Sequence, residues 1–125
     1  MIACSSKEEL APATIVGKWA PTYITQTKQA GGTFGAWYTI NTLVALPVYE
    51  FTNDGRFLMD GKPGETCCSS GSKYSVSENK INFTERTICP NVKCELCENW
   101  KIIEIKGDTL ILDECFFRNK YVRIK

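Results

Sequence analysis

The sequence predicts an all-β domain: an antiparallel up-and-down meander of about eight strands that closes into a barrel and is cross-linked by disulfides. Three observations predict this fold. Short segments rich in Thr, Val, Ile and aromatic residues alternate with Gly, Asp and Asn turn signals, without the period of an amphipathic helix. The 125 residues, 43% of them hydrophobic, suit one domain with a modest core. Six of the seven cysteines lie in the second half of the chain.

Turn signals divide the first half of the chain into four expected strands. The first strand begins with Ile-Val-Gly-Lys-Trp and ends before the adjacent glycines at 31 and 32, which break the chain. An Asn-Asp-Gly turn at 53–55 joins the third and fourth strands, because these residues tolerate the positive φ that tight hairpins need. The expected strands are 15–25, 36–46, 48–52 and 56–59.

The second half of the chain predicts two more hairpins and a final strand. One hairpin turns at Glu78-Asn79 and the other at Gly107-Asp108, between segments rich in branched and aromatic residues. An open meander of this length leaves two exposed edges, so we expect the last strand to pair with the first and close a barrel. The expected strands are 73–77, 80–84, 100–105, 109–112 and 121–125.

Residues near the start and the end of the expected barrel sequence resemble a known family. Gly17-Lys18-Trp19 is similar to the Gly-x-Trp signature of the lipocalin/calycin superfamily, and Arg123 matches the arginine on its final strand. The resemblance implies that Arg123 stacks over Trp19 at the closed end of the barrel, a cation–π contact that contributes about 0.5–2 kcal/mol. The run 49–123 also resembles small lipocalin-like lipoproteins of Gram-negative bacteria. The alternative for Trp19 is an ordinary core residue, and the cysteine-rich section departs from the family pattern.

The amino terminus predicts an exported lipoprotein. Met1-Ile2-Ala3-Cys4 resembles the end of a bacterial lipobox, which implies a signal peptide and lipidation of Cys4; the alternative is an ordinary cysteine. The expected location is the bacterial cell envelope, anchored to the outer membrane on its periplasmic side or at the cell surface. The Lys7-Glu8-Glu9 triplet resembles a surface-sorting signal or is a solvated linker. We therefore expect a lipobox remnant and flexible tether at 1–13 and a lipocalin-like β-barrel domain at 14–125.

The other six cysteines form an even set of candidate disulfides. In an exported protein three disulfides are the default, and the sequence does not select among their pairings. Cys67 and Cys68 point to opposite faces of an extended chain, so we expect them to bond to different partners. These bonds would tie the loop at 61–72 to the loop at 86–98 or to Cys115. The set is Cys67, Cys68, Cys89, Cys94, Cys97 and Cys115.

The spacing of Cys94 and Cys97 leaves two alternatives to disulfides. Two thiolates separated by two residues grip one Zn²⁺, and Cys67, Cys68 or Cys89 would complete the site of a zinc-stabilised domain. A redox role would need the motif at a helix N-terminus in a βαβ context, which is not evident in the sequence. Because the lipobox indicates export, structural disulfides are the prediction, and we expect no metal and no cofactor.

Composition excludes several classes of function. The chain contains no histidine, the commonest general base and metal ligand. Its 15 basic and 14 acidic residues give no electrostatic footprint of a nucleic-acid binder. No apolar run approaches the roughly 20 residues needed to span a bilayer. We therefore expect a protein that is not an enzyme, binds no nucleic acid and contacts the membrane only through its N-terminal lipid.

The expected function is binding of a small apolar ligand in the barrel, without catalysis. Inward aromatic side chains would line such a cavity, and those beside the glycines at 31, 32 and 35 suit its mouth. Alternatively, the same side chains fill a small barrel, which then acts as a protein-interaction or envelope-structural module. That module would have disulfide-rigidified loops and an exposed apolar patch near 86–97. The candidates are Trp37, Tyr38, Tyr49, Phe51, Phe57 and Tyr74.

Overall fold

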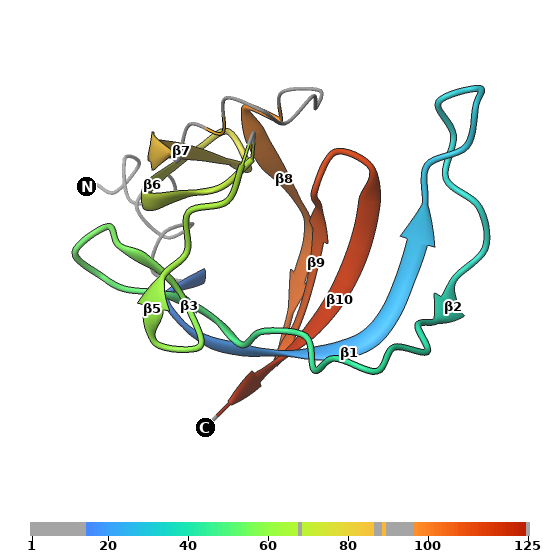
Figure 1. The fold of residues 1–125 in the computed structure, drawn as a ribbon, viewed down its shortest axis with the longest axis horizontal. Coiled ribbons are helices and arrows are strands. Elements are labelled where there is room, and N and C mark those ends of the chain that lie inside the picture. The colour runs from blue at the N-terminus through green and yellow to red at the C-terminus, as the bar shows by residue number, and fades with distance from the viewer. Residues whose placement is uncertain (1–14, 68, 87–88, 90–96, 125) are drawn as a thin grey trace, which may run out of the picture.

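The structure, a computed structural model, describes residues 15–67, 69–86, 89 and 97–124. Ten strands form one sheet in this part of the chain, and they curve around a common interior (Figure 1). The strands are β1 (Gly17–Thr27), β2 (Tyr38–Thr39), β3 (Tyr49–Phe51), β4 (Phe57–Met59), β5 (Lys62–Pro63), β6 (Gly71–Ser77), β7 (Lys80–Arg86), β8 (Asn99–Lys106), β9 (Thr109–Asp113) and β10 (Phe117–Ile124).

The order of the strands makes the sheet an antiparallel meander, as predicted. It runs β5-β4-β3-β1-β10-β9-β8-β7-β6, and the short β2 also pairs with β1. The two sides of the sheet meet between β4 and β6: Arg56 forms an isolated bridge with Lys73, and the Tyr74 amide donates a 2.9 Å hydrogen bond to the Gly55 carbonyl. The sheet is therefore nearly closed into a barrel, which leaves few strand edges exposed.

Pairing of the first and last strands confirms the expected closure. β10 runs antiparallel to β1, with Trp19 opposite Arg123 and Thr27 opposite Phe117. β10 is longer than the expected strand at 121–125 because it pairs on both edges, with β1 and with β9. The register of β1 shifts between Pro21 and Thr25, where Tyr23 has a φ of 67°. This bulge bends the strand, which is strongly curved in Figure 1.

The strand expected at 36–46 is wrong over most of its length. Only Tyr38–Thr39 pairs, as β2, while Leu43 and Val44 are exposed. One edge of β1 pairs with β10, and on its other edge β3 pairs with Gly17–Trp19 while this segment pairs only with Ile24 and Thr25, on either side of the bulge at Tyr23. Its branched residues had indicated a strand, but such residues favour a strand only where their side chains pack against those of neighbouring strands.

Aromatic rings fill the interior of the barrel. The ring centroid of Tyr49 lies 5.2 Å from that of Phe57, 5.4 Å from that of Trp100 and 4.9 Å from that of Tyr121. Each such buried ring stabilises the fold by roughly 1.5–3 kcal/mol relative to an exposed one. The buried core comprises Ile15, Trp19, Tyr49, Phe51, Phe57, Tyr74, Ile81, Phe83, Cys97, Trp100, Leu110, Leu112 and Tyr121.

In the part of the chain that the structure describes, two disulfides cross-link the loops. Cys67 is bonded to Cys89, with 5.7 Å between their Cα atoms, which ties the loop after β5 to the loop after β7 as expected. Cys97 is bonded to Cys115, with 6.0 Å between Cα atoms, which joins the segment before β8 to the turn between β9 and β10. The predicted disulfide cysteines Cys68 and Cys94, and the predicted lipidation site Cys4, lie outside the described residues.

The disulfides bear directly on the zinc alternative. That alternative required thiolates at Cys94 and Cys97, completed by a residue such as Cys67 or Cys89. The structure has Cys67, Cys89 and Cys97 in disulfides, and a disulfide sulfur does not supply the thiolate that binds zinc. The zinc site built on these residues is therefore wrong.

Replacing both Cys97 and Cys115 with alanine is expected to lower the free energy of unfolding by about 3 kcal/mol, because the bond closes a loop in the unfolded chain. Urea unfolding of the oxidised protein measures the change. Reductant should then destabilise the double variant less than it destabilises the wild type, because one bond fewer remains to be reduced. An unchanged midpoint in the double variant would contradict a stabilising role for this disulfide.

Candidate functional site

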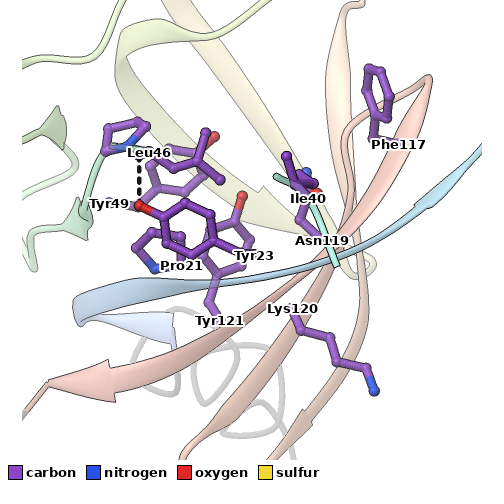
Figure 2. A pocket seen from close by; sticks show the side chains of 10 residues that line it. Pro21, Tyr23, Ile40, Leu46, Tyr49, Phe117, Asn119, Lys120 and Tyr121 are labelled. Atoms are coloured by element: carbon purple, nitrogen blue, oxygen red, sulfur yellow. Dashed lines mark hydrogen bonds between the residues drawn. The ribbon is translucent and has the colours of Figure 1, made fainter. Parts of the chain in front are cut away.

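A pocket lies beside the aromatic core, between β1, β10 and the segment that leads from β2 to β3 (Figure 2). Its volume is about 180 Å³. Most of the lining is apolar or aromatic, and Figure 2 shows the rings of Tyr23, Tyr49 and Tyr121 gathered on one side. The lining residues are Pro21, Tyr23, Ile40, Leu46, Pro47, Tyr49, Phe117, Asn119, Lys120 and Tyr121.

The β1 bulge builds one wall of this pocket. Tyr23 lies in the bulge, and its carbonyl accepts a 2.7 Å hydrogen bond from the amide of Ile40. Its hydroxyl accepts a 3.0 Å bond from the amide of Leu46 (Figure 2). A strand residue thus hydrogen-bonds to both ends of an irregular segment, and the end residues Ile40 and Leu46 line the cavity. Pro21 has no amide hydrogen to contribute to a ladder, so it suits a position where the register is about to shift.

A carboxylate lies directly behind the pocket wall. Glu114 occupies the turn between β9 and β10, and its Oε1 accepts a 2.9 Å hydrogen bond from the Tyr49 hydroxyl. Its Oε2 accepts a 2.9 Å bond from Asn119 Nδ2 and another bond from the Tyr121 hydroxyl. The three residues that donate to Glu114 all line the pocket. The pocket therefore has one polar end backed by an acidic group.

Burial raises the pKa values of the acidic groups in this cluster. It raises the pKa of Glu114 above the ordinary value, with nearby Asp113 adding to the rise, while the hydrogen bonds from Tyr121, Asn119 and Tyr49 oppose it. Burial and the neighbouring Glu114 raise the pKa values of Tyr49 and Tyr121 well above the ordinary value, so both phenols remain protonated. Among the described residues no lysine or arginine forms an ion pair with Glu114.

The barrel-closing residues proposed from the sequence lie together at the pairing of β1 with β10. The guanidinium carbon of Arg123 lies 4.2 Å from the ring centroid of Trp19, and its Nη1 donates a 2.8 Å hydrogen bond to the carbonyl of Val16. Gly17 has a φ of 136°, and a Cβ there would lie 2.8 Å from Arg123 Nη1. Glycine is therefore required at this position to admit the guanidinium.

The six aromatic residues proposed to line a cavity are divided among three places. Phe51, Phe57 and Tyr74 pack together in the core. The ring centroid of Phe51 lies 4.9 Å from that of Phe57 and 5.1 Å from that of Tyr74. Trp37 and Tyr38 lie away from the core: Lys120 Nζ is 4.5 Å above the Trp37 ring, and the Tyr38 hydroxyl bonds to Thr27. Of the six, Tyr49 alone appears in the lining of the described pocket.

Sequence reasoning missed Glu114, Asn119, Tyr121 and Tyr23 as a group. A signal for part of the group was present. Asn119 and Tyr121 lie four and two positions before Arg123, so on a strand they share a face with the arginine already singled out. Glu114 gave no such signal, because its contact with Tyr49 depends on how a turn and a strand residue 65 positions apart are placed in the fold.

Replacing Arg123 with alanine is expected to lower the free energy of unfolding by about 2 kcal/mol, because it removes the contact with Trp19 and the bond to Val16. Urea unfolding monitored by tryptophan fluorescence measures the loss. The matched control is Arg56→Ala, whose exposed side chain forms only a solvated ion pair with Asp54 and should cost well under 1 kcal/mol. Equal losses in the two variants would contradict a special role for Arg123.

The stability of the protein is expected to fall as pH rises above the ordinary pKa of Glu114. Between the ordinary pKa of Glu114 and its raised pKa in the folded protein, the folded chain keeps a proton on Glu114 that the unfolded chain has released, so stability is lost across that interval. Glu114→Gln removes this dependence, so its stability relative to wild type should improve with rising pH. Urea midpoints from pH 4 to pH 8 measure the difference, and Glu104→Gln, at an exposed position of β8, is the control. A constant difference across this range would contradict the prediction.

The described residues contain no group of three or more acidic, histidine or cysteine side chains placed to hold a metal ion. Nor does the described part of the chain contain a helix of the length and hydropathy needed to cross a membrane. Comparisons with protein families, with curated proteins and with solved structures find no match for this chain.

Proposed function

We propose that the protein is an exported bacterial lipoprotein whose lipocalin-like barrel binds a small, largely apolar molecule without catalysis. The pocket between β1, β10 and the β2–β3 segment is the observation that carries this proposal. Pro21, Ile40, Leu46 and Pro47 offer apolar surface that is released from water when a ligand binds, and the tyrosine rings add flat contact area.

The dimensions of the pocket favour a small occupant. Its volume of about 180 Å³ lies below the range of roughly 300–1,000 Å³ found for drug-sized ligands. The packed rings of Tyr49, Phe57 and Trp100 block extension of the ligand into the barrel interior. The proposed ligand is therefore a single ring, a short chain or one end of a longer molecule.

Two further observations support the envelope location and the absence of catalysis. Disulfides such as Cys67–Cys89 and Cys97–Cys115 persist in oxidising compartments, which include the space outside the inner membrane of bacteria. The lipobox-like Cys4 would add a lipid anchor to the outer membrane. The chain has no histidine, and the hydrogen-bonding groups of Tyr49, Asn119 and Tyr121 in the pocket wall are engaged with Glu114.

A second candidate function is a protein-interaction or envelope-structural module. It is favoured by the exposed apolar side chains of Leu43, Val44, Phe116 and Phe117, together with the filled barrel interior. The patch expected for this alternative near 86–97 lies largely outside the described residues. The two candidates differ in what a small molecule does: the module would bind none in the pocket.

Binding of 2-phenylethanol is expected to shift the backbone NMR signals of Tyr23, Ile40 and Leu46, which line the pocket. Leu46→Trp places a larger side chain in the lining and should abolish these shifts. The control is Ile103→Trp, an exposed position on β8, which should leave them intact.

Two results would contradict the ligand-binding proposal. One is the absence of saturable shifts at millimolar alcohol. The other is shifts confined to Leu43, Val44 and Phe116, which would favour the interaction module.

A further inference from the structure

The polar end of the pocket is backed by a buried carboxyl group whose ionised form has no counter-charge among the described residues. Glu114 receives hydrogen bonds from three neutral donors, whereas no cationic side chain pairs with it among the described residues. A buried carboxylate without a counter-charge loses hydration that neutral donors replace only in part. The raised pKa of Glu114 reflects the same deficit. A cation at this end of the pocket would supply the missing partner.

The pocket offers a place for such a cation. The rings of Tyr23, Tyr49 and Tyr121 lie on one side of the cavity, and the centroids of Tyr49 and Tyr121 are 4.9 Å apart (Figure 2). Ammonium groups are attracted to the faces of aromatic rings. The hydroxyls of Tyr49 and Tyr121 bond directly to Glu114. A cation beside these phenols would therefore be separated from the carboxylate only by the two hydroxyl groups.

An anionic ligand finds no equivalent partner. The one cationic residue in the lining of the described pocket is Lys120, and Figure 2 shows its side chain pointing away from the tyrosine rings. Its Nζ lies 4.5 Å from the centroid of the Trp37 ring. The carboxylate of a short fatty acid would therefore face Glu114 with no positive charge between them, and like charges at close range repel.

We propose that the pocket selects a small primary amine with an apolar or aromatic body, whose ammonium group lies beside the hydroxyls of Tyr49 and Tyr121 and is attracted by Glu114. This inference rests on the proposed ligand-binding function and names the chemical class of the ligand. The apolar body occupies the space between Pro21, Ile40 and Leu46. No bond is made or broken in the complex.

Three probes of one shape test the inference on the full chain: 2-phenylethylamine, 2-phenylethanol and 3-phenylpropionate, which differ mainly in the charge of one end. Calorimetric titration at pH 7 should find the amine bound about tenfold tighter than the alcohol, the factor that corresponds to one charge-assisted contact. The carboxylate should bind most weakly. NMR shifts at Tyr23 and Leu46 show that each probe occupies the pocket.

Variants connect the preference to Glu114. Glu114→Gln should bring the affinities of the amine and the alcohol to within about threefold, because the attraction of the charge is lost. Glu104→Gln removes an exposed acidic group on β8 and should keep the wild-type preference. Tyr121→Phe keeps the ring and removes the hydroxyl, so it should weaken binding of the amine more than binding of the alcohol. The NMR spectra of Tyr121→Phe and Glu114→Gln report whether each variant is folded.

Each outcome has one interpretation. Equal binding of amine and alcohol in the wild-type pocket would overturn the amine inference and leave the ligand-binding proposal standing. Tighter binding of 3-phenylpropionate than of 2-phenylethylamine would also overturn the inference, as would an amine preference that survives in Glu114→Gln. Binding of none of the three probes would overturn the ligand-binding proposal itself.

Discussion

The pairing of β1 with β10 determines where the other groups of this barrel lie. Trp19 faces Arg123 across that pair, and the guanidinium fits over the indole because Gly17 has no side chain. Asn119 and Tyr121 precede Arg123 on alternate positions of the same strand, so the register that stacks the arginine also turns these two side chains toward Tyr49 and Glu114. A slip of one residue would point all three to the opposite face.

Packing in the interior explains why the cavity lies where it does. Tyr49 is shared between two environments: its ring packs against Phe57 and Trp100, while its hydroxyl reaches Glu114. The core rings leave no room in the middle of the barrel, and space remains where the β1 bulge separates the strand from its neighbours. The disulfide of Cys115, one residue beyond Glu114, holds the turn that carries the carboxylate.

The sequence predicted the fold better than the pocket, for physical reasons. Hairpins such as the one at 53–55 are local, because the turn residues specify the backbone that joins the strands. Of the strand expected at 36–46 only Tyr38–Thr39 pairs, with Ile24 and Thr25 of β1, because β-propensity does not by itself supply a neighbouring strand. Glu114 and Tyr49 contact each other from distant parts of the sequence. The residues next to each of them in the sequence do not indicate that the carboxylate will be buried. Disulfide pairing depends in the same way on the folded arrangement of the loops.

The attachment of the pocket wall affects the kinetics of exchange. Two hydrogen bonds join the segment around Ile40 and Leu46 to β1, and both end on Tyr23. Apart from these, the segment presents Leu43 and Val44 to solvent, so little packing opposes its displacement. Release of Tyr23 would free the Leu46 end of the wall, whereas the Ile40 end stays beside Thr39, which pairs with Ile24 of β1. The residence time of an occupant would then follow the opening rate at Leu46 more than the strength of its own contacts.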